Sequence, residues 1–175
     1  TKSKNLDPVK LAQIDSLLNT YVANNWLVGA STIIVNDNQV VYYKGHGFAN
    51  QASKKPMEAN AIFRIMSQTK AITSLAILQL FENGKIGLDQ AVGDFIPSFY
   101  KQTVLKDFNA ADTTYTTVPA KRNITIRDLL THTSGIDYAA IGSKKMQAIY
   151  AKADMPSGLG KSNASLLDVM KKLGT

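Results

Sequence analysis

The stretch from Met66 to Lys85, MSQTKAITSLAILQLFENGK, decides how the chain folds and what chemistry it can carry. Apolar residues recur every three or four positions from Ala71 to Phe81, which predicts a helix, and Asn83-Gly84 supplies a stop. Because this helix is apolar on nearly all sides, we expect it to be buried. Its first turn nevertheless is polar and includes Ser67 and Lys70.

Ser67 and Lys70 are three residues apart, so on a helix they share a face with roughly 5–6 Å between their Cβ atoms. The lysine amine could then accept the serine proton, above all if apolar neighbours favour its neutral form, and the exposed N–H groups of the helix start could stabilise an oxyanion. The alternative is that Ser67 only caps the helix and Lys70 is solvated, since serine is a favoured N-cap. Local chemistry leaves both interpretations open.

A second Ser-x-x-Lys match, Ser98 to Lys101 in IPSFYKQ, is an internal control. About one chance match is expected in a chain this rich in serine and lysine. This one follows a proline and precedes no helical pattern, so we interpret it as chance. The position of Ser67 at a helix start is what distinguishes it.

The rest of the chain indicates an α+β fold with an antiparallel sheet that is incomplete. Asp7 and Pro8 predict the start of an amphipathic helix, and the runs Ser31–Val35 and Val40–Lys44 predict a hairpin across a polar turn. Two strands are too few for a stable sheet. No tract is long and apolar enough to suggest a transmembrane segment.

The second half is predicted to be mainly helical. We expect the polar, threonine-rich segment 101–122 to be an extended loop or an insertion, and we interpret Thr125 and Asp128 as the capping box of a short helix. Ser162 or Asn163 is the expected cap of a last helix.

Composition excludes several functional classes. The 175 residues carry a formal charge of +7, but the lysines are scattered and not interleaved with aromatic residues, so we expect no nucleic-acid partner. Cysteine is absent, and His46 and His132 lack a third ligand at metal spacing, so the sequence predicts no metal and no cofactor. The triplet Gly160-Lys161-Ser162 lacks the strand and first glycine of a phosphate-binding loop.

Three segments together resemble a known family. They are WLVGASTIIVNDNQVVYYKGHGFAN (26–50), IFRIMSQTKAITSLAILQLFENGKIGLDQAVGDFIPSF (62–99) and ITIRDLLTHTSGI (124–136). In this order they are similar to the serine β-lactamase-like superfamily, in the branch of class C β-lactamases, D-Ala-D-Ala carboxypeptidases and family VIII esterases. The resemblance implies an antiparallel sheet flanked by helices with a mainly helical subdomain.

The same resemblance implies a serine hydrolase without a cofactor. Ser67 would be the nucleophile and Lys70 its activator, and the reaction would pass through an acyl-enzyme formed from a β-lactam, a D-Ala-type peptide or a small ester. The alternative is a non-catalytic relative that binds cell-wall peptide or acts as a sensor. Membership of this family makes a periplasmic or secreted protein the expectation, and the substrate would be a small molecule or peptide.

Two further motifs of the family are not found. No tyrosine is followed two positions later by asparagine, so Tyr115, Tyr138 and Tyr150 all fail the Tyr-x-Asn pattern, and no Lys-Thr-Gly or His-x-Gly strand is present. We therefore expect residues 1–175 to be the N-terminal portion of one β-lactamase-like domain, with helix and hairpin in 1–50 and the nucleophile helix and helical subdomain in 62–175. Its own C-terminal part, as a separate chain, would be the partner that completes the site, and the fragment alone would be inactive.

Overall fold

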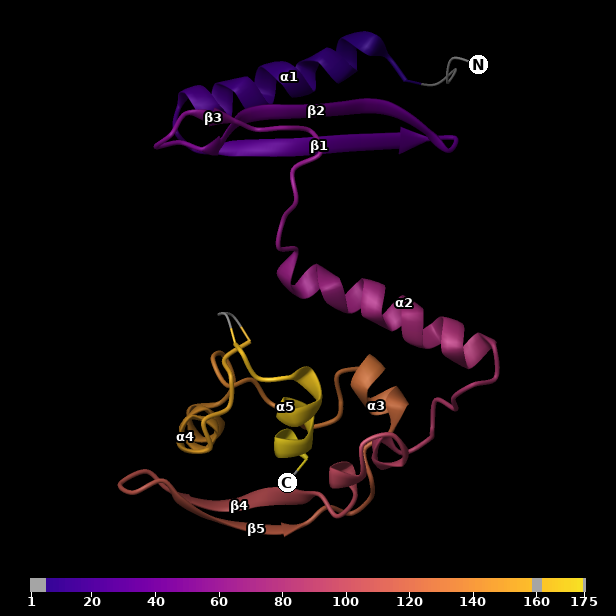
Figure 1. The fold of residues 1–175 in the computed structure, drawn as a ribbon, viewed down its shortest axis with the longest axis vertical. Coiled ribbons are helices and arrows are strands. Elements are labelled where there is room, and N and C mark those ends of the chain that lie inside the picture. Colours follow the sequence, from indigo (N-terminus) through magenta and orange to yellow (C-terminus); the bar gives the residue numbers. More distant parts are fainter. Residues whose placement is uncertain (1–5, 159–161, 175) are drawn as a thin grey trace. The chain divides into compact units, whose positions relative to one another are not determined.

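The computed structural model describes residues 6–158 and 162–174 of an α+β chain (Figure 1). It has two compact units, residues 1–66 and 67–175. The helices are α1 (Pro8–Ala23), α2 (Thr69–Glu82), α3 (Ile126–Leu130), α4 (Lys144–Lys152) and α5 (Leu166–Leu173). The strands are β1 (Gly29–Asn36), β2 (Gln39–Asn50), β3 (Lys55–Pro56), β4 (Thr103–Asn109) and β5 (Thr114–Pro119). Short 3-10 turns are η1 (Met66–Gln68), η2 (Val92–Asp94) and η3 (Pro97–Phe99).

The first unit contains the predicted helix and hairpin. The side chain of Asp7 accepts the N–H of Val9 at 2.8 Å, so Asp7 caps α1 as expected. Strands β1 and β2 pair antiparallel, and β3 adds to the other edge of β2. The connecting turn has Asp37 and Asn38 at φ 49° and 59°, the left-handed pair that suits the twist of a two-residue hairpin.

Polar side chains join α1 to β2, which lie side by side in Figure 1. Tyr42, Lys44 and His46 alternate along β2 and so share one face of the strand. The Tyr42 hydroxyl donates to Asp15 of α1 at 2.6 Å and lies 2.9 Å from His46 Nε2, while Lys44 Nζ donates to Asp15 at 2.7 Å. His46 is therefore a buried, hydrogen-bonded residue of the fold.

The core of the second unit is a small apolar cluster. Val92, Phe99 and Ile126 are buried there. Partly buried apolar side chains surround them: Ile77, Ile86, Leu88, Ile96, Ile124, Leu130, Ile136 and Leu173. The capping box predicted for α3 is confirmed, because the Asp128 side chain accepts the N–H of Thr125 and the Thr125 side chain accepts the N–H of Asp128.

The prediction of a loop over residues 101–122 is wrong, because β4 and β5 form an antiparallel hairpin there. The segment is polar, but threonine, valine and tyrosine fit a pleated, exposed ribbon better than a loop. The cap predicted for the last helix is also misplaced. Ser165 caps α5 by accepting the N–H of Asp168 at 3.1 Å, three residues after the expected Ser162.

The expectation that residues 69–82 are buried is wrong as well. Of the α2 side chains, all of which the structure describes, none is buried, and Ile72 and Leu75 are 63% and 59% exposed. Ile77 joins the core cluster, so the helix contacts its unit along a narrow stripe. Over the described residues, no helix is both long and apolar enough to cross a membrane.

Candidate active site

Ser67 and Lys70 meet at the start of α2. Ser67 lies in the turn η1, and Lys70 is the second residue of the helix. Lys70 Nζ donates a hydrogen bond to Ser67 Oγ at 3.2 Å. A basic side chain within hydrogen-bond reach of a hydroxyl is the arrangement that proton transfer from the hydroxyl requires.

The serine is not used as a helix cap. The N-cap position of α2 is Gln68, whose side chain makes no capping hydrogen bond. The Ser67 side chain instead lies one residue further out and accepts from Lys70. The simple capping interpretation therefore does not describe this turn.

The backbone before the serine is held in an unusual conformation. Met66 has φ +48°, in the left-handed region that residues other than glycine seldom adopt. The chain then enters η1 before the α-helix begins at Thr69. This tight entry carries Ser67 to the end of the helix, where the first N–H groups have no intrahelical acceptor.

Ser67 and Lys70 are both exposed among the described residues, and so are Gln68 and Thr69 between them. Burial beside apolar neighbours, the condition named from the sequence for the lysine to act as a base, is not seen at these four residues.

Tyr138, which fails the Tyr-x-Asn pattern in the sequence, lies beside Lys70 in the structure. The Lys70 ammonium lies 5.5 Å from the ring centroid of Tyr138, within the range of a cation–π contact. Tyr138 lacks the asparagine of the Tyr-x-Asn pattern, and it lies in an irregular segment before α4, where no periodicity marks a side chain as important. Only the fold brings residues 70 and 138 together.

The segment that carries Tyr138 is tied to the start of α4. The Asp137 carboxylate accepts the N–H of Ser143 and the N–H of Tyr138, both at 2.8 Å. These two bonds, that from Ser143 above all, hold the pKa of Asp137 below its usual range. The Asp137 carboxylate occupies the space that a Cβ at Gly142 would take, so a larger residue at position 142 would displace this carboxylate.

The second Ser-x-x-Lys match has no such geometry. Ser98 Oγ is buried and, among the described residues, has no hydrogen-bond partner. Lys101 follows with φ +63°, outside any helix. The interpretation of this match as chance agrees with the structure.

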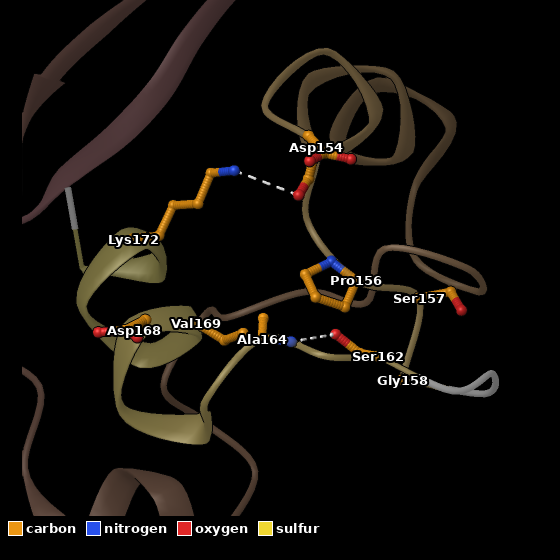
Figure 2. A pocket seen from close by; sticks show the side chains of 9 residues that line it. All are labelled: Asp154, Pro156, Ser157, Gly158, Ser162, Ala164, Asp168, Val169 and Lys172. Carbon is orange, nitrogen blue, oxygen red and sulfur yellow. Dashed lines mark hydrogen bonds between the residues drawn. The ribbon is translucent and has the colours of Figure 1, made fainter.

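Other hollows in the second unit do not include Ser67 or Lys70. Figure 2 shows a pocket of about 350 Å³ in which Lys172 Nζ donates to the backbone oxygen of Asp154 at 3.2 Å. A larger one of about 550 Å³ is lined by both strands of the β4–β5 hairpin and by the Arg122–Asp128 ion pair. Gly160 and Lys161 of the rejected phosphate-loop triplet lie outside the described residues. In the described parts of the chain, no group of three or more potential ligands could hold a metal ion.

The sequence matches the family described as Beta-lactamase over residues 14–173. The chain belongs to the beta-lactamase family. The match includes the whole α2 region and both compact units. Together with the similarity to the solved structures described next, this match confirms the fold class.

Relatives and solved structures are similar to nearly the whole chain or to about half of it. Esterase EstB of Burkholderia gladioli is 28% identical over 171 residues, which is 97% of this chain and 40% of the esterase. Acyltransferase calJ of Penicillium decumbens is 40% identical over 83 residues, 47% of this chain and 19% of calJ. The solved structure of EstCE1, a hydrolase with promiscuous acyltransferase activity, matches with a TM-score of 0.71 and 27% identity, over 94% of this chain and 39% of EstCE1.

A fourth relative supports the fold alone. The LovD6 mutant of simvastatin synthase from Aspergillus terreus has a TM-score of 0.70 at 21% identity, over 99% of this chain and 47% of that one. The chain thus spans about two fifths of the length of EstB and EstCE1.

Proposed function

We propose that this chain is the part of a serine hydrolase or acyltransferase that carries the nucleophile Ser67 and its activating base Lys70. The observation that carries the proposal is the 3.2 Å hydrogen bond between Lys70 Nζ and Ser67 Oγ, on a serine that does not cap its helix. The two-fifths coverage of EstB supports the further proposal that residues 1–175 act together with a C-terminal part as one domain.

The reaction begins with proton transfer. The neutral Lys70 amine takes the Ser67 proton while Oγ bonds to the substrate carbonyl carbon, and the carbonyl oxygen becomes an oxyanion near the free N–H groups of the helix start. The tetrahedral intermediate then expels the leaving group, which takes the proton from Lys70. Water, or an acceptor alcohol in acyl transfer, attacks the acyl-enzyme and restores Ser67.

An ester is the substrate class that the comparisons favour. EstB is named an esterase, and EstCE1 is described as a hydrolase that also transfers acyl groups. Both share the region of this chain that holds the Ser–Lys pair. We therefore propose a small carboxylic ester as substrate in preference to a β-lactam or a D-Ala peptide.

Intact mass spectrometry with a fluorophosphonate tests the nucleophile in the complete protein. We expect one covalent adduct, found on Ser67 after proteolysis and lost in Ser67→Ala, while Ser98→Ala keeps it. An adduct that survives Ser67→Ala would exclude Ser67. Absence of any adduct in the folded wild-type protein would instead favour the non-catalytic binding or sensor relative.

The same material decides the substrate class. Parallel incubation with a fluorescent penicillin and with p-nitrophenyl butyrate compares lactam and ester acylation of the same serine. Release of p-nitrophenol without a stable penicillin adduct supports the ester. A lasting penicillin adduct with no ester turnover would contradict it.

A further inference from the structure

Lys70 has a long and flexible side chain, so its hydrogen bond to Ser67 needs a second restraint to persist. Four rotatable bonds separate the ammonium from the backbone, and an exposed lysine samples many rotamers. In the structure the ammonium lies between Ser67 Oγ at 3.2 Å and the Tyr138 ring at 5.5 Å. These two contacts come from segments that are about seventy positions apart in the sequence.

We propose that Tyr138 is a positioning residue whose aromatic ring holds the Lys70 ammonium beside Ser67. The inference rests on the proposed function and assigns to it a residue outside the Ser-x-x-Lys element. The negative face of the ring attracts the cation, and this attraction selects lysine rotamers that also reach Ser67. After proton transfer from Ser67, when the lysine is again charged, the same ring stabilises the ammonium.

The ring can act in this way because its own backbone is fixed. Asp137 accepts the N–H of Tyr138 and the N–H of Ser143, and the backbone oxygen of Tyr138 accepts the N–H of Gly142 at 3.2 Å. Gly142 leaves the space that the Asp137 carboxylate occupies. The segment 137–143 thus forms a closed turn whose geometry is fixed by hydrogen bonds at both ends.

The contact is carried by the ring and not by the phenol oxygen. The observed geometry places Lys70 Nζ over the ring centroid. Phenylalanine at this position would keep the face of the ring, whereas leucine would keep apolar bulk without the quadrupole. The two substitutions therefore separate a cation–π restraint from hydroxyl chemistry and from simple packing.

The test measures pre-steady-state acylation of the complete protein by p-nitrophenyl butyrate. We expect Tyr138→Leu to lower the acylation rate constant by about two- to thirtyfold without weakening substrate binding, and Tyr138→Phe to keep most of the rate. Tyr115→Leu is the matched control, because Tyr115 and Tyr138 are 49% and 47% exposed. We expect Tyr115→Leu to acylate like the wild type.

A second readout reports the contact itself. The ε-methylene NMR signal of Lys70, assigned by its loss in Lys70→Arg, should carry a ring-current shift that persists in Tyr138→Phe and disappears in Tyr138→Leu. The proposal is overturned if this signal does not move in Tyr138→Leu, if Tyr138→Leu acylates normally, or if Tyr138→Phe is as slow as Tyr138→Leu. A wild-type protein that never acylates would instead refute the proposed function.

Discussion

The proposed role of the Ser67–Lys70 pair depends on the transfer of one proton between the two side chains. Lys70 Nζ lies within hydrogen-bond distance of Ser67 Oγ, and only an amine with a lone pair can accept the hydroxyl proton. A base at this position therefore has to be a group that can be neutral. Charge alone would not support the reaction.

The substitution Lys70→Arg tests this point. Arginine keeps the positive charge and can stack on Tyr138, but its guanidinium stays protonated and cannot act as a base. We expect acylation to slow by about a hundredfold or more, as for loss of a general base. Stopped-flow measurement of p-nitrophenol release checks it, and an arginine variant with near-normal acylation would remove Lys70 from the role of base.

The sequence predicted this pair from its spacing and helix-start position, and the structure shows the two side chains in hydrogen-bond contact. Their roles stay predictions. Tyr138 was rejected because the Tyr-x-Asn pattern was searched for along the chain, whereas its contact with Lys70 exists only in three dimensions. The burial expected for residues 69–82 was wrong for a related reason, because periodicity shows which face is apolar but not what covers it.

At the scale of single elements, α3 is held by two Arg–Asp pairs in very different surroundings. Arg122 binds Asp128, whose side chain is 10% exposed and also closes the capping box with Thr125. Arg127 binds Asp89, whose side chain is 75% exposed. A buried carboxylate that loses its charge leaves its donors unsatisfied, whereas an exposed one is replaced by water.

We expect Asp128→Asn to lower the free energy of unfolding by about 2–4 kcal/mol, whereas the control Asp89→Asn should leave the free energy of unfolding almost unchanged. The Arg122 guanidinium, with help from Thr125, holds the pKa of Asp128 far below its usual range. Its stabilising contribution is therefore complete above about pH 4 and is lost as the pH falls below that. Urea unfolding of the wild type and both variants at pH 7 and pH 3 measures this contribution. If Asp128→Asn and Asp89→Asn lost the same free energy of unfolding, the prediction would be wrong.

In the first unit, the contact between α1 and β2 has the opposite pH dependence. Burial, and then the hydrogen bond to Asp15, raises the pKa of Tyr42 to about 12. The native state therefore keeps the phenol proton that the unfolded chain loses near pH 10, so the contribution of Tyr42 to stability is complete below about pH 10. That contribution is lost as the pH rises towards 12.

As the pH rises from about 10 towards the Tyr42 pKa of about 12, we expect the free energy of unfolding to fall less in Tyr42→Phe than in the wild type. Tyr43→Phe is the control, since Tyr43 is the next residue and is 46% exposed. Urea unfolding followed by tryptophan fluorescence at pH 8 and pH 11 gives the comparison. The same alkaline loss in all three proteins would show that Tyr42 does not titrate as expected.

The hairpin of residues 31–44 and the capping box of residues 125 and 128 were predicted because local turn and cap chemistry decides both. The β4–β5 hairpin was missed because β5 is exposed on both faces and only Leu105 and Phe108 of β4 are half-buried, so the alternation of apolar and polar residues that marks a half-buried strand is absent. Threonine content alone did not distinguish a ribbon from a loop.

For the whole molecule, much apolar surface is uncovered in the described chain. Ile72 and Leu75 of α2 and Ile33 and Val35 of β1 are each more than half exposed. Exposed apolar side chains that lie close together on one element are often covered by other protein. EstB and EstCE1 have further chain beyond the region matched here, and chain of that kind is the occupant we propose for both faces.

We expect residues 1–175, expressed alone, to bind the dye ANS strongly, and Ile72→Gln with Leu75→Gln to reduce the binding. In the complete protein the same pair of substitutions should lower the free energy of unfolding by about 2–5 kcal/mol, because it would place polar groups in a covered interface. Dye fluorescence and urea unfolding of the two lengths provide the comparison. Unchanged stability of the complete protein would mean that this face of α2 stays in water.

The left-handed turn at Met66 has a consequence for how this chain can vary. At φ +48° the Cβ atom is too close to the backbone, which costs about 1 kcal/mol for a residue other than glycine and more for a β-branched residue. We therefore expect glycine and asparagine to be tolerated at position 66, and isoleucine and valine to destabilise the protein there, although the residue present is hydrophobic. Natural variants at the position before Ser67 would then be selected first by the backbone conformation they allow, and only afterwards by side-chain character.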